Sequence, residues 1–339
     1  MLTEKEIKQI QDELDNCKRP IFFFHDDPDG LASFLLLYRY IKEGKGIVLK
    51  ARPKITKQFA EKAIEYGADK VFVLDIASVD QEFIDLVKIP VIWIDHHTPL
   101  ERDNVKYFNS RLRNNTNTPV SYMCYQITKQ DDWIALTGCI GDWYIPDFIK
   151  TFSKKYPKLI GGAKTIEDLL FKTLIGKLCK IFSFNLKGTT SDVRKAIKIF
   201  TRIENPFEIL EQNTPKGKLL YKKYEQINKT YEELLQKALK VKKGKIIVFT
   251  YSEDKSSLTK DLANELMYRF PDKIIVLGRE KSGELRCSIR SNKVNLTKAV
   301  EKALVGIEGY GGGHERACGA GIKKEYFKQF LKNLEKEIK

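Results

Sequence analysis

The chain has 339 residues, 42% of them hydrophobic, which is enough to bury two domains of ordinary size. No apolar run reaches the roughly 18 residues of a membrane-spanning helix. The start of the chain, with its Thr3-x-x-Glu6 capping box, is typical of an amphipathic helix rather than a signal peptide, and the net charge of +15 favours polyanionic partners. We therefore expect a soluble, cytoplasmic protein. Its six widely spaced cysteines should be buried thiols, with disulfides as the alternative.

The positive charge is concentrated in the middle of the chain. From Thr151 to Lys243 there are 21 Lys and Arg residues against 9 Asp and Glu, so +12 of the net charge falls there. Such a segment attracts polyanions by releasing their condensed counterions, which favours a nucleic-acid partner. The alternative is a lysine-rich solvated surface.

Residues 21–95 alternate short apolar runs with helical patterns. We expect strands at 21–24, 46–51, 71–75 and 91–95, and helices at about 31–43, 56–67 and 80–88. Continuous apolar runs are typical of strands buried on both faces, and the helical segments are long enough to cross between parallel strands. The pattern predicts a doubly wound α/β domain with a parallel sheet.

The rest of the chain indicates a helical region and a second domain. An apolar stretch from Trp133 to Trp143 predicts a buried helix, and a long amphipathic helix should begin after Pro215 and join two domains. We expect further strands at 245–252, 273–279 and 284–291, and helices near 257–270, 296–305 and 325–338. These elements predict a second, smaller α/β domain.

All four histidines lie in short Asp- or Gly-rich motifs: HDDPDG, IDHH and GGGHERACGA. His25, Asp75 and Asp95 each stand at the carboxyl end of a predicted strand, where open α/β sheets bind ligands. We therefore expect three distant segments to meet in one crevice. Neutral imidazole is a strong ligand for transition metals, so the motifs suggest a metal site facing a phosphate site.

Each candidate metal ligand also has an ordinary structural explanation. His25, Asp27 and Asp29 alternate and can point at one volume, but D-x-D-G is also a common turn. Asp75 can simply cap the next helix. His96 and His97 are harder to explain without a metal, because two adjacent charged imidazoles repel each other. Asp142 lies in an apolar stretch and needs a partner, which is either a metal or a salt bridge.

The ordered series H-x-D-x-D-G, a strand-ending D, D-H-H, G-D, S-x-R-S and G-G-G-H resembles the DHH phosphoesterase superfamily, close to its RecJ-like nucleases. The resemblance covers nearly the whole chain. It implies a DHH catalytic domain at 1–200, a helical connector at 201–243 and a DHH-associated substrate domain at 244–339. The final Asp of the nanoRNase pattern H-x-x-x-D-x-D corresponds to Leu31, whereas the D-x-D-G of RecJ-like members is present.

The resemblance also implies roles for individual residues. Two divalent ions, Mn²⁺ more than Mg²⁺, would be held by six ligands, with Asp75 bridging: His25, Asp27, Asp29, Asp75, His96 and Asp142. Of the catalytic pair, His97 would contact the phosphate or orient the ligands, and Asp95 would position its neighbours. The substrate phosphate or terminal nucleotide would be bound by the glycine loop and its neighbours: Arg290, Ser291, Gly311, Gly312, Gly313 and His314.

We therefore expect a Mn²⁺-dependent hydrolase. The first hypothesis is an exonuclease that degrades single-stranded DNA or RNA to nucleoside 5'-monophosphates, with 3'-to-5' digestion slightly favoured. The alternative is a phosphodiesterase for oligoribonucleotides, cyclic dinucleotides or 3'-phosphoadenosine 5'-phosphate. Some relatives are replication or repair scaffolds without metal ligands, but here every ligand position is filled. A role in DNA repair, with a replication or repair protein as a further partner, fits the first hypothesis. Tyr221, Tyr224 and Tyr231 are either stacking platforms for bases or helix-packing residues.

Overall fold

The computed structural model describes residues 1–50, 54–241, 244–252 and 257–338. Contacts within the chain divide it into two compact units, Met1–Tyr224 and Glu225–Lys339. None of the described helices is both long enough and apolar enough to cross a membrane. The six cysteines, all of which lie among these residues, form no disulfide, and all but Cys17 are buried.

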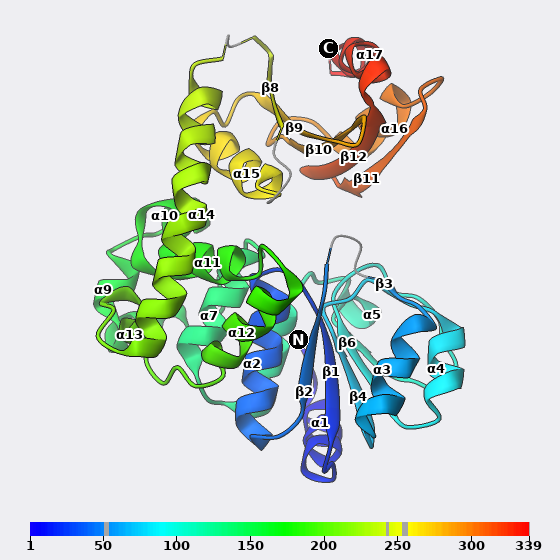
Figure 1. Cartoon of the computed structure of the whole chain (residues 1–339), viewed down its shortest axis with the longest axis vertical. Helices are drawn as coiled ribbons and strands as arrows, with labels where there is room; N and C mark the ends of the chain where they lie inside the picture. Colours follow the sequence, from blue (N-terminus) through cyan, green and yellow to red (C-terminus); the bar gives the residue numbers. More distant parts are fainter. Residues whose placement is uncertain (51–53, 242–243, 253–256, 339) are drawn as a thin grey trace. The chain divides into compact units, whose positions relative to one another are not determined.

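The first unit is built on a five-stranded parallel sheet (Figure 1). Its strand order is β2-β1-β4-β6-β7, and every neighbouring pair is parallel. The strands are β1 Pro20–His25, β2 Lys45–Leu49, β4 Lys70–Leu74, β6 Val91–Asp95 and β7 Lys106–Asn109. Because the chain goes outward from β1 to β2 and then returns to β4 on the other side, the strand order reverses between β1 and β4.

Both faces of this sheet are buried because successive side chains of each strand point to opposite faces. Ile21 and Phe23 belong to a core that also contains residues of α3 (Gln58–Tyr66) and α4 (Gln81–Val87). Phe22 and Phe24 instead contact Phe34 of α2 (Pro28–Ile41), with ring centroids 5.6 and 4.7 Å apart. The short strands β3 (Lys54–Ile55) and β5 (Ser78–Val79) pair separately.

A layer of helices completes the first unit on the α2 side of the sheet. α2 packs against α6 (Val120–Thr128) and α7 (Asp132–Gly141), and α7 packs against α11 (Leu174–Asn185). The remaining helices are α1 Glu4–Asp15, α5 Arg111–Asn114, α8 Ile149–Lys155, α9 Pro157–Ile160, α10 Ile166–Lys172, α12 Thr190–Phe200 and α13 Pro206–Leu210.

The long helix α14 (Pro215–Leu239) belongs to both units. In its first half, Tyr224 stacks on Phe184 of α11 with ring centroids 5.8 Å apart, and the Tyr221 hydroxyl accepts a hydrogen bond from Lys177. In its second half, the buried Tyr231 donates a hydrogen bond to Glu265 of the second unit. Tyr224 and Tyr231 are therefore helix-packing residues, which is the second of the two explanations above.

The second unit is a mixed five-stranded sheet of order β11-β12-β10-β9-β8, in which β8 and β9 pair in parallel and the other neighbours are antiparallel. α16 and α17 cover one face, while α15 packs on β9 and β10. The elements are β8 Ile246–Ser252, α15 Thr259–Arg269, β9 Ile274–Lys281, β10 Glu284–Arg290, α16 Leu296–Ala303, β11 Gly309–His314, β12 Ala317–Lys323, η1 Lys324–Tyr326 and α17 Phe327–Glu337.

The predicted fold class is confirmed: a parallel α/β domain, helices, and a smaller second sheet domain. Several details differ. The strand expected at 46–51 occupies 45–49, and residue 51 lies outside the described residues. The helix expected from 31 begins at Pro28, because Asp27 caps it and proline suits its first turn. β7, β11 and β12 were not predicted.

Replacing Phe34 by alanine should destabilise the first unit strongly. Phe34 is 2% exposed and contacts two strand phenylalanines, so the substitution leaves a cavity between α2 and the sheet. We expect the free energy of unfolding to fall by about 3–5 kcal/mol in urea denaturation. Ile64→Ala is the control: Ile64 is 61% exposed, so the change should stay within about 0.5 kcal/mol. Equal effects of the two substitutions would contradict this packing.

Candidate metal centre

Three adjacent strands bring polar side chains to the carboxyl edge of the first sheet. His25 ends β1, Asp75 directly follows β4, and Asp95 ends β6. The reversal of strand order between β1 and β4 makes this edge the expected position of a ligand crevice. Asp75 has a φ of 57°, which is uncommon for a residue with a side chain, and its N–H donates to the Ile94 carbonyl at 3.1 Å.

The first turn of α2 lies directly on the end of β1. Asp27 Oδ1 accepts a hydrogen bond from the Gly30 N–H at 3.1 Å, and Asp27 Oδ2 lies 3.1 Å from His25 Nδ1. Only glycine fits at position 30, because a Cβ there would lie 2.5 Å from the His25 carbonyl oxygen. The close approach therefore places the carboxylates of this turn beside His25.

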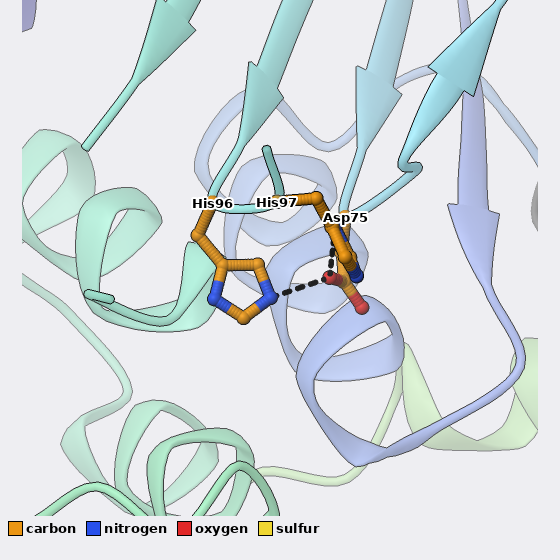
Figure 2. Close-up of side chains that lie close together, drawn as sticks. All are labelled: Asp75, His96 and His97. Carbon is orange, nitrogen blue, oxygen red and sulfur yellow. Dashed lines mark ion pairs between the residues drawn. The ribbon is translucent and has the colours of Figure 1, made fainter. Parts of the chain in front are cut away.

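Asp75 is the centre of the cluster. Its Oδ2 lies 3.2 Å from His25 Nδ1, and its Oδ1 lies 3.2 Å from His96 Nε2 and 4.0 Å from His97 Nδ1. Figure 2 shows that the imidazoles of His96 and His97 both approach the same oxygen of this carboxylate, Oδ1. Asp75 is only 1% exposed, so one buried carboxylate contacts the side chains of all three motif histidines of the first unit.

Asp29 and Asp142 complete the cluster from helices. Asp142 follows α7, and its Oδ2 lies 3.3 Å from His96 Nε2. Asp29 is fully buried and accepts hydrogen bonds from the N–H groups of Val120 and Ser121 at 2.8 and 2.9 Å, and from the Ser121 hydroxyl. Asp29 therefore also binds the amino end of α6.

The pKa values reflect a surplus of buried negative charge. Burial raises the pKa of Asp29 well above its usual value, and the nearby Asp75 and Asp142 raise it further. Burial alone would lower the pKa of His96, but Asp142 and Asp75 outweigh it and raise the pKa to about 10. The pKa of His25 is likewise raised well above its usual value, since burial is outweighed by Asp27 and Asp75.

These side chains fit a divalent cation. Within the described residues, three overlapping sets each place their ligand atoms within 4.8 Å of one another: Asp75, His96 and His97; His25, Asp27 and Asp75; and Asp29, His96 and Asp142. His96 Nδ1 is buried and finds no hydrogen-bond partner among those residues, while His96 Nε2 lies between Asp75 and Asp142. Imidazole nitrogen and carboxylate oxygen together suit transition-metal ions.

Asp95 holds His97 rather than joining the cluster directly. Its Oδ1 lies 2.8 Å from His97 Nδ1, and its Oδ2 accepts from the His97 N–H at 3.0 Å. Burial lowers the pKa of His97, but Asp95 outweighs burial and raises it. The positioning role of Asp95 stays a prediction.

Two residues that support this loop were not predicted from the sequence. Asn109, the last residue of β7, donates from Nδ2 to Asp95 Oδ2 at 3.3 Å and to the His97 carbonyl at 3.0 Å. Arg111 donates from Nε to the His96 carbonyl at 2.6 Å. A polar residue ending a strand next to β6 was the available signal, but it required β7 to be recognised.

The second unit holds the predicted substrate residues on or directly beside its sheet, with Ser291 just after the end of β10. Arg290 is 8% exposed and donates from Nε to Asn264 Oδ1 at 2.6 Å and from Nη1 to the Ile289 carbonyl at 2.9 Å. Burial lowers its pKa to about 10. Ser291 Oγ accepts from the N–H groups of Lys293 and Val294.

The glycine triplet is not a loop. Gly311, Gly312 and Gly313 lie in the exposed edge strand β11, which pairs with β12. In the β11–β12–β10 register, His314 lies opposite Ala317, and Ala317 lies opposite Arg290. Directly opposed residues share a face of the sheet, so His314 and Arg290 occupy the same face. Their binding roles remain predictions.

Two family models match the chain. The DHH family N-terminal domain matches residues 21–137, and the DHHA1 domain matches residues 243–339. Together they match more than half of the chain and include the motifs described above, except that Asp142 lies just beyond the first match. The chain therefore belongs to the DHH superfamily of phosphoesterases and has a RecJ-like architecture.

Solved structures show the same fold at low sequence identity. RecJ from Thermus thermophilus in complex with Mn²⁺ is 14% identical with a TM-score of 0.70, over 98% of this chain and 54% of RecJ. A manganese-bound exonuclease RecJ is also 14% identical, with a TM-score of 0.62, and the match covers 98% of this chain and 93% of that RecJ. The pGpG-specific phosphodiesterase PggH from Vibrio cholerae is 13% identical, with a TM-score of 0.50, and the match covers 95% of this chain and 99% of PggH.

This chain spans about half the length of the Thermus RecJ. No curated protein matches it.

Asp95→Asn should lower the pKa of His97 in the metal-free protein. The substitution removes the negative charge that does most to raise this pKa against burial, so the pKa should fall, with Asp75 still raising it. Proton NMR titration can follow each imidazole, because the chain has only four histidines. His314, in the other unit, is the internal control and should titrate unchanged. An unaltered His97 titration would show that Asp95 does not set its charge.

Proposed function

We propose that this protein is a metal-dependent phosphodiesterase, and specifically an exonuclease that degrades single-stranded DNA or RNA to nucleoside 5'-monophosphates. The observation that carries the proposal is the buried Asp75 carboxylate, which contacts His25, His96 and His97 beside further carboxylates at the sheet's switch point. The fold shared with RecJ exonucleases supports the substrate class.

The proposed metal ligands and the neighbouring His97 would have different roles. Two divalent ions would be held by His25, Asp27, Asp29, Asp75, His96 and Asp142. Bound there, such ions supply Lewis-acid activation of water and neutralise phosphate oxygens. Histidine in the ligand set favours Mn²⁺ over Mg²⁺. Asp95 accepts from His97 Nδ1, so Nε2 is the ring nitrogen left to contact a phosphate.

The second unit would bind the substrate through its sheet. Arg290 and His314 occupy one face, and the glycines beside His314 leave the edge strand open to a phosphate or sugar. Gly312 is the clearest case, because a Cβ there would meet no described atom within 4 Å. The basic segment 151–243 would attract the strand. A replication or repair protein is a further proposed partner.

A second candidate function is hydrolysis of short or cyclic oligonucleotides. It is favoured by the shared fold with PggH, whose length this chain matches almost fully. Rates that fall with chain length and depend little on salt would identify this function. Rates that rise with length and fall with salt would identify the exonuclease.

The proposed activity can be tested with end-labelled single strands and Mn²⁺. The native protein should release labelled mononucleotides, and comparing 5' with 3' labels on DNA and RNA tests the proposed 3'-to-5' direction. His96→Ala and Asp75→Ala should each abolish the activity, because each removes a ligand of the buried cluster. Asp103→Asn, at an exposed position, should leave it unchanged. Robust activity in the purified, folded Asp75 variant would rule out this assignment of the site.

Metal binding should release protons and strengthen as pH rises. The pKa of His96 is raised to about 10, so the metal-free protein holds its proton at pH 7, whereas a metal ligand must be neutral. Affinity for Mn²⁺ should therefore increase with pH until about 10. Titration calorimetry at pH 7 in two buffers of different ionisation enthalpy measures the protons released. Equal heats in both buffers would contradict the prediction, and His96→Ala should release fewer protons.

A further inference from the structure

Three lysines of the first unit meet at the turn between α11 and α12. Lys187 belongs to the turn itself. Lys50, just after β2, donates from Nζ to the Gly188 carbonyl at 2.8 Å, and Lys223 of α14 donates from Nζ to the Asn185 carbonyl at 2.7 Å. Lys50 and Lys223, which are far apart in sequence, therefore bring their ammonium groups to this turn, and the Lys187 ammonium is near enough to lower the pKa of Lys50.

Among the described residues, Lys50 and Lys223 have no carboxylate partner. Neither has a carboxylate oxygen within 4.0 Å anywhere in the part of the chain that the structure describes, and their hydrogen bonds go to main-chain carbonyls. From farther away, the charges of Asp26 and Asp192 raise the pKa of Lys50, and the charge of Asp192 raises the pKa of Lys223. The Asp192 carboxylate already accepts a hydrogen bond from the Thr189 hydroxyl.

The lysines destabilise one another's charge. Burial lowers the pKa of Lys223 to about 8, and the charge of Lys50 lowers it against the opposing effect of Asp192. Burial also lowers the pKa of Lys50, as does Lys187, while Asp26 and Asp192 raise it. Ammonium groups of like charge close to one another are unfavourable without an anion, so this arrangement suits an anionic ligand.

The lysine cluster adjoins the candidate metal centre. In the pairing of β1 with β2, Leu49 lies directly opposite His25, and Lys50 is the next residue. Neighbouring strands lie only about 4.8 Å apart. The charge of Asp26, which follows His25, raises the pKa of Lys50. Both sites belong to the same compact unit. An anion bound by these lysines would therefore be next to a phosphate at the metal centre.

We propose that Lys50, Lys187 and Lys223 form a subsite for a second phosphate of the substrate, next along the strand from the phosphate that is hydrolysed. Lysine ammonium groups bind phosphates as point charges. The inference rests on the proposed function and narrows it, because a substrate that uses this subsite carries at least two phosphates. The subsite thus favours a substrate with successive phosphates, such as an oligonucleotide or polynucleotide strand, over a dinucleoside monophosphate.

The first test measures binding without hydrolysis. A fluorescent phosphorothioate strand of about 12 nucleotides is titrated by anisotropy with Mn²⁺ present, at salt concentrations from about 50 to 200 mM, and its integrity is checked on a gel. Lys50→Gln and Lys223→Gln should each weaken binding and reduce the slope of log K against log[salt] by about 0.7, and the double variant by about 1.4. Urea denaturation confirms that the variants are folded.

Lys198→Gln is the matched control, because Lys198 is an exposed lysine near the other end of α12. It should change the slope much less. Unchanged slopes in the Lys50 and Lys223 variants, or an equal change in the Lys198 variant, would overturn the proposal in favour of diffuse attraction to a basic surface.

The second test compares substrates that differ in their number of phosphates. The lysine variants should lower kcat/KM for the strand but hydrolyse a dinucleoside monophosphate, which has only one phosphate, at the native rate. Equal losses on both substrates would overturn the subsite. If the variants change strand binding as expected but the native protein hydrolyses neither substrate, the proposed function fails and the subsite stands. If the native protein hydrolyses the strand but the lysine variants leave the salt slope unchanged, the subsite fails and the proposed function stands.

Discussion

The structure of the first unit depends on how it tolerates negative charge buried at one edge of its sheet. Asp29 and Asp75 are at most 1% exposed, and Asp27 and Asp142 lie around the same histidines. Two like charges about 4 Å apart repel by about 4 kcal/mol at an effective dielectric constant of about 20. In the metal-free protein, protonated His25 and His96 offset this repulsion, and the raised pKa of Asp29 lowers it further because this carboxylate takes up a proton more readily. Divalent cations would replace those protons with larger charge.

The scaffold brings these groups together by close packing of backbones rather than by flexible loops. Gly30 lets the first turn of α2 lie on the end of β1. Gly138 does the same between helices, because a Cβ there would lie 2.5 Å from Ser121 Oγ and 2.7 Å from the Ala32 Cβ. α7, which leads into Asp142, is thereby held against α2 and α6. Ser121 and Val120 in turn bind Asp29, so ligand geometry and helix packing depend on each other.

The sequence predicted the strands best where both faces of the strand are buried, because such strands are continuous apolar runs. Strands β1, β4 and β6 are continuous apolar runs, and the polar residues at their ends could be assigned to one crevice because each stands at the carboxyl end of a predicted strand. β7 has four residues and no such run, so Asn109 and Arg111, whose contacts with this loop are to backbone carbonyls and a single carboxylate, carried no motif. β11 and β12 are rich in glycine, which disfavours strands locally. The pairing of β12 with β10, and of β11 with β12, overrides that preference, and such pairing cannot be read from a short segment.

The opposite charges of the first unit place a constraint on substrate binding. The lysines at the α11–α12 turn attract phosphates, but the carboxylate cluster beside His25 repels them whenever its charge is not balanced. A phosphodiester can therefore approach the cluster favourably only when cations are bound there. By thermodynamic linkage, cations that favour the phosphate must be held more tightly in its presence, by the same factor. Metal affinity measured without substrate would thus be a lower bound on the metal affinity during the reaction.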